Sequence, residues 1–342
     1  MGSNGRFSEN LIDLNGKNIL VTGGTGSFGQ WFVRNVLGKF KPRRLIIFSR
    51  DELKQHEMAQ TFSTEEQGVL RFFIGDVRDH DRLVMALRGV EYVVHAAALK
   101  HVPIAEYNPF ECIHTNVIGA ENLVRASIQM GIEKVLAMST DKACNPVNLY
   151  GASKLAADKI FVAANNLSGK AGTDFSIVRY GNVVGSRGSV VPLFQRLIKE
   201  GAQSLPVTDE RMTRFWITLD QGVNFVLSCM NMMRGGEIFV TKIHSMRITD
   251  LAESMAPGVP HELIGIRPGE KLHEVMLTDA DSRSAVELDD RFIIEPEFAS
   301  WDHETHLTDE AQRPPENFSY TSDTNTEWLS NGDFKDLLEA GN

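Results

Sequence analysis

A strand that runs directly into a glycine-rich loop and then a helix constrains the fold of this chain more than any other feature. The apolar run NILVT leads into TGGTGSFG, where Gly23, Gly26 and Gly29 follow a GxxGxxG spacing. Glycines at these positions let the backbone turn tightly and approach a pyrophosphate at the N-terminus of the following helix. The flanking strand and helix argue against a merely flexible turn, so the motif predicts a dinucleotide-binding fold.

Apolar runs rich in β-branched residues alternate with amphipathic stretches as far as residue 180. Such alternation is typical of parallel strands that crossover helices cover on both faces. We therefore expect an α/β protein with a Rossmann-type doubly wound parallel sheet and a smaller C-terminal substrate-binding α/β region. The expected parts are an N-terminal extension (1–17), an NADP-binding domain with the catalytic residues (18–180), a mainly substrate-binding region (181–299) and an acidic, partly ordered tail (300–342).

Charge, hydropathy and cysteine usage argue against several classes of protein. The formal net charge of -10 repels polyanions, so we expect no nucleic acid partner and a phosphate site built from local basic residues. No apolar run is long enough for a signal peptide or a membrane span, which predicts a cytoplasmic protein without a membrane partner. Cys112, Cys144 and Cys229 lack metal-ligand spacing, so we expect buried free thiols and no metal site.

The end of the second expected strand bears on the choice of cofactor. An acidic residue roughly 20 residues after the last glycine would bind the ribose 2'-hydroxyl of NAD. This chain has Ser49 and Arg50 there, with Lys54 one helical turn later, and a hydroxyl with two cations suits the 2'-phosphate of NADP. Asp51 leaves an alternative open, because a shift of one residue would place its carboxylate near the ribose. Its other interpretation is an N-cap of the next helix.

Tyr150 and Lys154 form a candidate catalytic pair. They are four residues apart at the start of an expected helix over 149–165, so their side chains share one helix face. An ammonium beside a phenol lowers the phenol pKa from its usual value of about 10 and favours a phenolate base. A YxxxK motif after the fifth strand of a glycine-loop domain therefore predicts cofactor-dependent oxidation, with an exposed Tyr-Lys pair as the alternative.

The GxxGxxG variant and the YxxxK motif together resemble the extended short-chain dehydrogenase/reductases. The resemblance is closest to the inverting UDP-N-acetylglucosamine 4,6-dehydratases of pseudaminic acid biosynthesis, and it covers residues 18–298. It rests on TGGTGSFG, FSRDELKQ, HAAALKHVP, STDKACNPVNLYGASK, RYGNVVGSRGSVVP, RMTRFWIT and GIRPGEKLHE. These motifs together are far more specific than the glycine loop alone.

The dipeptide Asp141-Lys142 indicates which branch of these enzymes the chain resembles. Related retaining 4,6-dehydratases carry Asp-Glu at this point, whereas Asp-Lys is typical of the inverting branch and of its membrane-bound relatives. Those relatives tend to have methionine at the position of Tyr150 and bear large transmembrane extensions. Tyr150 therefore favours the inverting type. Without the resemblance, a solvated loop pair would explain Asp141 and Lys142 equally well.

The resemblance also implies a reaction. Tyr150 takes the C4-hydroxyl proton while hydride leaves C4 for NADP+, and the resulting ketone makes the C5 hydrogen acidic. Lys142, if neutral, removes the C5 proton, and protonated Asp141 donates to the departing C6 hydroxyl, although these two roles stay open. Hydride returns to C6, and protonation of the opposite face inverts C5. Thr140 would bind the C4 oxygen, and Lys154 would also hold the nicotinamide ribose.

The same resemblance implies the binding residues. Asp76 would contact adenine, although capping of the next helix is an alternative, and the run Ala96-Ala97-Ala98 would let the cofactor approach. The cofactor set is Gly23, Thr25, Gly26, Ser27, Phe28, Gly29, Ser49, Arg50, Lys54, Asp76, Val77, Ala96, Ala97, Ala98, Tyr150 and Lys154. The UDP-sugar set is Lys100, Asn182, Arg187, Arg211, Arg214, Arg267 and Glu270, and each arginine alone could instead form a surface ion pair. Self-association into a dimer or larger homo-oligomer is also implied.

Two other kinds of function share some of these features. A retaining dehydratase or a 4-epimerase of a UDP-sugar would share the fold, Tyr150 and Lys154, and Lys142 is the residue that separates them from the inverting type. A non-catalytic NADP-binding redox sensor is a rival from another class. Because a sensor could lose Tyr150 or Lys154 freely, their presence in register argues against it.

Overall fold

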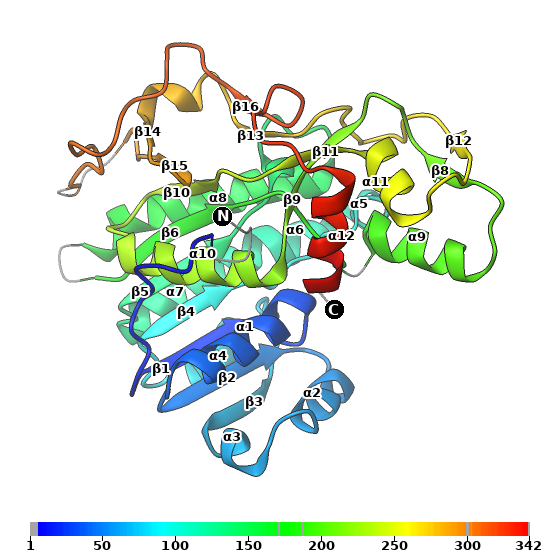
Figure 1. Ribbon diagram of the computed structural model, residues 1–342. Coiled ribbons are helices and arrows are strands. Elements are labelled where there is room, and N and C mark those ends of the chain that lie inside the picture. The colour runs from blue at the N-terminus through cyan, green and yellow to red at the C-terminus, as the bar shows by residue number, and fades with distance from the viewer. Residues whose placement is uncertain (1–5, 170–171, 187, 299–300, 302, 341–342) are drawn as a thin grey trace.

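One large sheet organises the fold of the computed structural model, which describes residues 6–169, 172–186, 188–298, 301 and 303–340 (Figure 1). The bounds of its strands are β1 Asn18–Thr22, β2 Arg44–Ser49, β3 Leu70–Ile74, β4 Tyr92–His95, β5 Lys134–Met138, β6 Asp174–Arg179, β10 Ile238–Thr241, β14 Ala285–Glu287 and β15 Arg291–Ile294. Across the described residues, the nine strands follow the order β14-β15-β10-β6-β5-β4-β1-β2-β3. The expected α/β fold with a Rossmann-type parallel sheet is confirmed.

Helices cover both faces of this sheet. Their bounds are α1 Ser27–Lys39, α2 Glu52–Ala59, α3 Thr64–Val69, α4 His80–Ala86, α5 Val102–Tyr107, α6 Pro109–Ile113, α7 Gly119–Met130, α8 Leu149–Ser168 and α10 Leu219–Met232. On one face α1 packs against α10, and on the other face α7 packs between α4 and α8 (Figure 1). The strands β1, β2, β4, β5 and β6 are therefore buried almost throughout, as expected for a parallel sheet covered on both sides.

The sheet continues beyond the point where the sequence analysis ends it. From β3 to β10 neighbouring strands are parallel, whereas β15 runs antiparallel to both β10 and β14. Strands β10, β14 and β15 all lie after residue 180 in the chain. Residues on both sides of the expected boundary at residues 180 and 181 therefore contribute strands to this one sheet.

A second, smaller core forms among the later elements at the right of Figure 1. Its strands are β7 Asn182–Val183, β9 Thr213–Ile217 and β11 Ser245–Arg247, which form one sheet, and β8 Leu205–Val207 and β12 His261–Leu263, which form another. The helices of this smaller core are α9 Val190–Lys199, α11 Ile248–Met255 and α12 Asn331–Ala340. A further strand pair, β13 Val275–Leu277 with β16 Tyr320–Thr321, contributes its buried residues to the main core instead. The smaller core matches the expected smaller α/β part.

Residues from both ends of the chain pack into these cores. Phe334 of α12 is fully buried, with its ring 5.6 Å from that of Trp216, and Tyr320 is buried as well. Near the other end, Leu14 is buried and Arg6 forms an ion pair with Glu327 at 2.6 Å. Within the expected tail, Tyr320 and Phe334 thus anchor the described residues to the two cores.

Two further expectations concern the whole chain. Cys112, Cys144 and Cys229 are buried free thiols, as the sequence predicts. Among the described residues, no helix combines the length and the apolar character that crossing a bilayer would require.

Candidate active site

The glycine loop joins β1 to α1 and leaves room for a dinucleotide. Gly23 has a φ of +65°, and a Cβ atom there would lie 2.9 Å from the backbone of Ala96. A Cβ atom on Gly29 would overlap the backbone of Gly24, so α1 can begin directly on the loop only because Gly29 has no side chain. Gly26 caps α1 without a side-chain hydrogen bond, which suits binding of an anion by the first N–H groups of the helix.

The ends of β1 and β4 meet beside this loop. Thr22 Oγ1 accepts hydrogen bonds from the N–H groups of Ala96 and Ala97, each at 3.2 Å. Of the other residues in the predicted cofactor set, Thr25 is buried, and Ser27, Phe28 and Ala98 are half-buried. The structure thus brings the glycine loop and the alanine run together.

The predicted 2'-phosphate residues lie at the end of β2. The buried Ser49 hydroxyl accepts a hydrogen bond from Gln55 Nε2 at 3.0 Å. Arg50 is half exposed, and Lys54 pairs with Asp51 at 2.6 Å. Asp51 also accepts a hydrogen bond from the Lys54 backbone and caps α2, which confirms the capping interpretation of this residue. The two cations are about equally exposed, and Arg50 is the one with the longer ion pair, to Asp76 at 3.6 Å.

Asp76 and Val77 lie after β3. The Asp76 carboxylate contacts Arg78 at 2.7 Å and Arg50 at 3.6 Å. Partial burial acts to raise the pKa of Asp76, but the hydrogen bonds from Arg78 outweigh it and the pKa is lowered. The alternative role of Asp76 as a helix cap is wrong, because Asp79 caps α4. Val77 is buried in the main core.

Tyr150 and Lys154 lie in the first turns of α8, where both side chains are buried. Burial raises the pKa of Tyr150 to about 12, while the charge of Lys142 and a hydrogen bond with Thr140 act to lower it. Burial also lowers the pKa of Lys154, against the charge of Asp158. The expected lowering of the phenol pKa by Lys154 is therefore not found. Burial is the larger influence, and the main opposing positive charge is that of Lys142.

Asp141 and Lys142 lie in a single 3-10 turn, η3 Asp141–Ala143, that begins directly after β5 and Ser139-Thr140. Lys142 Nζ is 3.0 Å from Asp141 Oδ1 and 3.2 Å from Glu274 Oε1. Burial alone would lower the pKa of Lys142, but the two carboxylates outweigh burial and raise it. The sequence analysis gives Lys142 the role of base only if its side chain is neutral, and this pKa shift favours the ammonium form instead.

The pKa of Asp141 shifts in the direction that a proton donor needs. Burial is the largest influence and raises this pKa, and the charge of Glu274 adds to it against the pull of Lys142. Thr140 Oγ1 donates to Asp141 Oδ1 at 2.9 Å and accepts from the N–H of Lys142 at 3.3 Å. The interactions of Thr140 thus fix the turn that carries the pair.

Glu274 is a site residue that the sequence analysis missed. It is 2% exposed and precedes β13, far along the chain from the residues that it meets. The signal was present, because Glu274 ends the GIRPGEKLHE motif, but only the spatial arrangement connects it with Lys142. Asp158 and Arg179 are a second missed pair, buried below the site at 3.7 Å, with Asp158 accepting a hydrogen bond from Ser139 at 2.8 Å.

The predicted UDP-sugar residues do not all lie together. Asn182 joins the catalytic cluster, with its Oδ1 3.5 Å from Lys142 Nζ, and Arg214 lies behind it with its Nε 3.6 Å from Glu274 Oε1. Lys100 is exposed on its loop, yet desolvation and the charge of Lys142 lower its pKa. Arg187 falls outside the described residues.

Arg267 and Glu270 form an exposed ion pair on a segment that passes the start of α8. Asn148, which caps α8, donates a hydrogen bond to the carbonyl of Gly269 at 2.8 Å. A Cβ atom on Gly269 would lie 3.1 Å from that of Asn148. The predicted pair is therefore held next to the helix that carries Tyr150.

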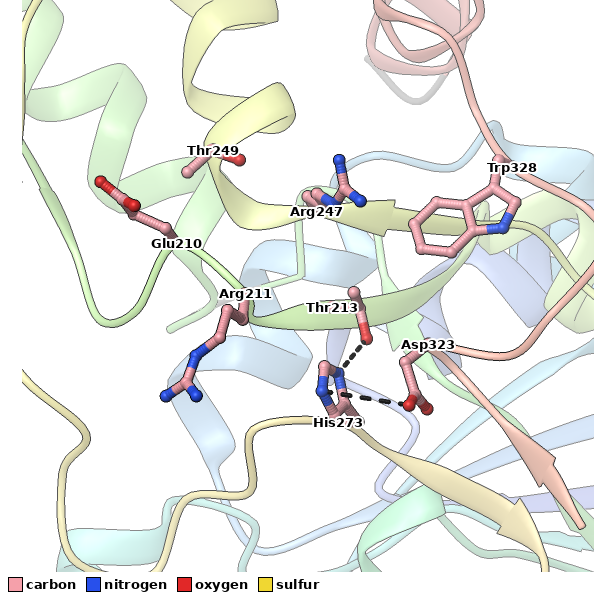
Figure 2. Close-up of a pocket in the computed structure, with 8 residues that line it drawn as sticks. All are labelled: Glu210, Arg211, Thr213, Arg247, Thr249, His273, Asp323 and Trp328. Carbon is pink, nitrogen blue, oxygen red and sulfur yellow. Dashed lines mark hydrogen bonds and ion pairs between the residues drawn. The ribbon is translucent and has the colours of Figure 1, made fainter.

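Arg211 lies apart from this cluster, in an open pocket of about 600 Å³ drawn in Figure 2. The lining residues are Glu210, Arg211, Thr213, Arg247, Thr249, His273, Asp323 and Trp328. Thr213 Oγ1 contacts His273 Nδ1 at 2.8 Å, whereas the next residue along each segment, Arg214 and Glu274, belongs to the catalytic cluster. Because successive side chains of a strand alternate between faces, the pocket lies on the opposite face of β9 from the cluster.

Comparison with known proteins places this arrangement in a family. The sequence profile of a family described as polysaccharide biosynthesis proteins matches residues 19–296. The chain belongs to this family. Two relatives from Campylobacter jejuni, both called UDP-N-acetylglucosamine 4,6-dehydratase (inverting), are 54% and 56% identical and align with 95% and 96% of this chain and 98% of their own. A Rickettsia canadensis protein called UDP-glucose 4-epimerase is 39% identical over 94% of this chain and 95% of its own.

Solved structures agree with this membership. The X-ray structure of Pen from Bacillus thuringiensis superposes with a TM-score of 0.87 at 37% identity, covering 96% of this chain and 99% of that one. DesIV from Streptomyces venezuelae, a dTDP-glucose 4,6-dehydratase with NAD and TYD bound, gives a TM-score of 0.67 at 25% identity over 75% of this chain and 86% of its own. The resemblance to extended short-chain dehydrogenase/reductases is confirmed.

Proposed function

We propose that this protein is a UDP-N-acetylglucosamine 4,6-dehydratase that inverts C5. Its product would be UDP-2-acetamido-2,6-dideoxy-β-L-arabino-hex-4-ulose. The observation that carries the proposal is the contact of Lys142 with Asp141 at the end of β5, next to the Tyr150-Lys154 pair. The names of the two Campylobacter jejuni relatives support the same reaction.

Residues of α8 and of the segment after β5 carry out the oxidation of C4. A bound nicotinamide dinucleotide supplies a hydride acceptor for C4 and later a hydride donor for C6. Tyr150 Oη takes the C4-hydroxyl proton, and the positive charge of Lys142 favours the phenolate that this transfer needs. Thr140 holds the C4 oxygen. Lys154, on the same face of α8, binds the nicotinamide ribose.

Asp141 and Lys142 carry out the elimination of water across C5 and C6. Loss of water removes a proton from C5, and the electron pair of that C–H bond forms the C5–C6 double bond while the C6 oxygen leaves with a proton. Because the two side chains touch at 3.0 Å, protons belong to the pair and not to either residue alone. The pair both accepts the C5 proton and supplies the proton of the departing water. A solvent-derived proton that later arrives at the opposite face of C5 inverts that centre.

We also propose that the cofactor is NADP. The half-exposed guanidinium of Arg50 supports this choice, because arginine pairs readily with a 2'-phosphate. The contact of Arg50 with Asp76 at 3.6 Å holds the guanidinium near the end of β2. The fit of the glycine loop to a pyrophosphate supports either dinucleotide, and DesIV was solved with NAD.

The remaining proposals concern the setting of the enzyme. The product would enter pseudaminic acid biosynthesis, and we expect the lyase to work in the cytoplasm as a homo-oligomer. The proposed UDP site comprises Lys100, Asn182, Arg187, Arg214, Arg267 and Glu270. Arg211 is the weakest member of the predicted set, because it lies in the separate pocket and pairs with Asp209 at 2.8 Å.

Product analysis tests the proposed reaction. Incubation with UDP-N-acetylglucosamine and NADP should give a nucleotide sugar that has lost one water, as mass spectrometry would detect. A product of unchanged mass and altered C4 configuration would replace the dehydratase with a 4-epimerase, the activity for which the Rickettsia canadensis relative is named. Absence of any turnover, with NADP still bound, would favour the redox-sensor alternative.

A further inference from the structure

The three donors of the Lys142 ammonium meet three oxygen acceptors from three separate segments. Asp141 Oδ1 lies at 3.0 Å, Glu274 Oε1 at 3.2 Å and Asn182 Oδ1 at 3.5 Å. An ammonium has three N–H bonds, so this set accounts for all of them. The orientation of the Lys142 head group is therefore fixed jointly by η3, β7 and the residue before β13.

Glu274 is itself held in place by the protein around it. Its backbone N–H donates to Ser322 Oγ at 2.9 Å, and its Oε1 lies 3.6 Å from Arg214 Nε. Arg214 in turn donates to the carbonyls of Lys271 and Leu272 at 3.0 and 3.1 Å. The carboxylate is thus positioned before any substrate binds, which is the arrangement expected of a group that supports a catalytic pair.

Two carboxylate oxygens in this cluster have no protein partner. Asp141 Oδ2 and Glu274 Oε2 are both buried and accept no hydrogen bond from the described residues. An unsatisfied buried carboxylate oxygen is costly, and such atoms in native proteins call for a functional explanation. A simple structural ion pair between Lys142 and one carboxylate would not need a second buried acid.

We propose that Glu274 is a positioning residue for the elimination step, which holds the Lys142 ammonium against Asp141 and keeps within that pair the proton that leaves with the C6 oxygen. This inference rests on the proposed dehydratase function. One proton moves from the Asp141-Lys142 pair to the C6 oxygen as the C6–O bond breaks. The proton removed from C5 passes to the pair and replaces it. Glu274 stays ionised and exchanges no proton with the substrate.

The charges around the cluster agree with this role. Burial acts to raise the pKa of Glu274, but Lys142, Arg214 and Lys271 outweigh it and lower the pKa, so the carboxylate keeps its charge. That charge raises the pKa of both Asp141 and Lys142.

Three other groups also interact with Lys142. Burial and the positive charge of Lys142 lower the pKa of Lys100. The same charge acts to lower the pKa of Tyr150. Arg214 acts to lower the pKa of Lys142. Among the described charged groups that act on Lys142, removal of the Glu274 charge leaves Asp141 as the one carboxylate, so the pair loses its proton at a lower pH.

Glu274→Gln in the holoenzyme tests the inference, because glutamine keeps the size of the side chain and removes its charge. We expect C4 oxidation, followed as reduced-nicotinamide absorbance in a single turnover, to persist while dehydration slows about tenfold or more. The high-pH limb of the dehydration rate should move down by about one pH unit or more. Glu274→Asp should return this limb to its wild-type pH even if the rate recovers only in part.

Three outcomes would overturn the inference. The first is a high-pH limb of the dehydration rate that does not move in Glu274→Gln. The second is a Glu274→Gln variant that loses C4 oxidation as well as dehydration. The third is a Glu274→Asp variant whose high-pH limb moves down as it does in Glu274→Gln. Thermal unfolding would reveal whether Glu274→Gln folds. If it does not, the high-pH limb of the dehydration rate is measured in Glu274→Asp instead, and a downward shift of that limb contradicts the inference. Glu262→Gln, at an exposed carboxylate on β12, serves as the matched control. Failure of the proposed function is distinct, because the wild-type protein would then give no dehydrated product.

Discussion

At Tyr150, burial and positive charge act against each other. Burial raises the pKa of the phenol to about 12, and Lys142 acts in the opposite direction. A group that must lose its proton to work therefore lies where its neighbours, and not solvent, decide its protonation. Lys142, and not Lys154 on the same helix, is the cation that acts to lower the pKa of this phenol.

Removal of the Tyr150 hydroxyl should abolish oxidation without harming the cofactor site. We expect Tyr150→Phe to reduce turnover by about 100-fold or more, because it removes the proton acceptor for the C4 hydroxyl. NADP binding, measured by isothermal titration, should persist, since the glycine loop is unchanged. Unchanged turnover in this variant would show that another group is the base.

We expect Arg50 to decide the preference between NADP and NAD. Its guanidinium is half exposed at the end of β2, whereas Lys54 is held by Asp51. Arg50→Ser should weaken NADP binding by about 10- to 100-fold, because a charge-assisted hydrogen bond is lost, and should leave NAD binding nearly unchanged. Arg43→Ser, at an exposed arginine away from the loop, is the control. Equal effects on both dinucleotides would argue against a 2'-phosphate contact.

Among the elements, α1 depends most strongly on a single residue type. Gly29 is buried at the start of this helix against the backbone of Gly24, whereas Gly38, near its end, has open space around it. The same helix thus contains one glycine that packing requires and one that it does not. A comparison of the two positions therefore distinguishes the packing requirement for glycine at the cofactor loop from the lower helix propensity that any glycine has within a helix.

Alanine substitutions at these two glycines should have opposite effects. Gly29→Ala should lower the free energy of unfolding by about 1–3 kcal/mol, because its Cβ atom overlaps the loop backbone, and should weaken NADP binding. Gly38→Ala should raise the free energy of unfolding by about 0.5–1 kcal/mol through the better helix propensity of alanine. Urea unfolding of both variants measures this. A Gly29→Ala protein as stable as wild type would contradict the packing argument.

At the scale of the whole molecule, segments distant in sequence complete the smaller core. Helix α12 brings Phe334 against Trp216 of β9, and β9 also carries Arg214, which contacts Glu274. Ser322 of the same C-terminal segment accepts the hydrogen bond of the Glu274 backbone. The C-terminal residues therefore support the strand and the loop from which the catalytic cluster is built.

Loss of the Phe334 ring should destabilise the protein as a core substitution does. We expect Phe334→Ala to lower the free energy of unfolding by about 3–5 kcal/mol. Phe298→Ala, at a phenylalanine that is 89% exposed, should change it by no more than about 0.5 kcal/mol. Chemical denaturation compares the two. Similar small effects for both would mean that α12 contributes little to the smaller core.

Features that depend on residues close together in the sequence could be predicted, whereas contacts between residues far apart in the sequence could not. The glycine loop, the parallel strands and the Tyr150-Lys154 pair follow from spacing within short segments, so they could be recognised before the structure. Glu274 could not, because its partner Lys142 lies in another part of the chain. The direction of the Lys142 pKa shift could not be predicted for the same reason, since the second carboxylate that raises this pKa was unknown.

The configuration at C5 of the product tests the central claim most directly. The protein should convert UDP-N-acetylglucosamine in deuterated water to a 4-keto-6-deoxy sugar that carries deuterium at C5, with that centre inverted, as NMR coupling constants would show. This result follows if the Asp141-Lys142 pair removes the C5 proton and a solvent-derived proton returns on the opposite face. A 4-keto-6-deoxy product with retained C5 configuration, or a product that keeps its C6 hydroxyl, would contradict the account.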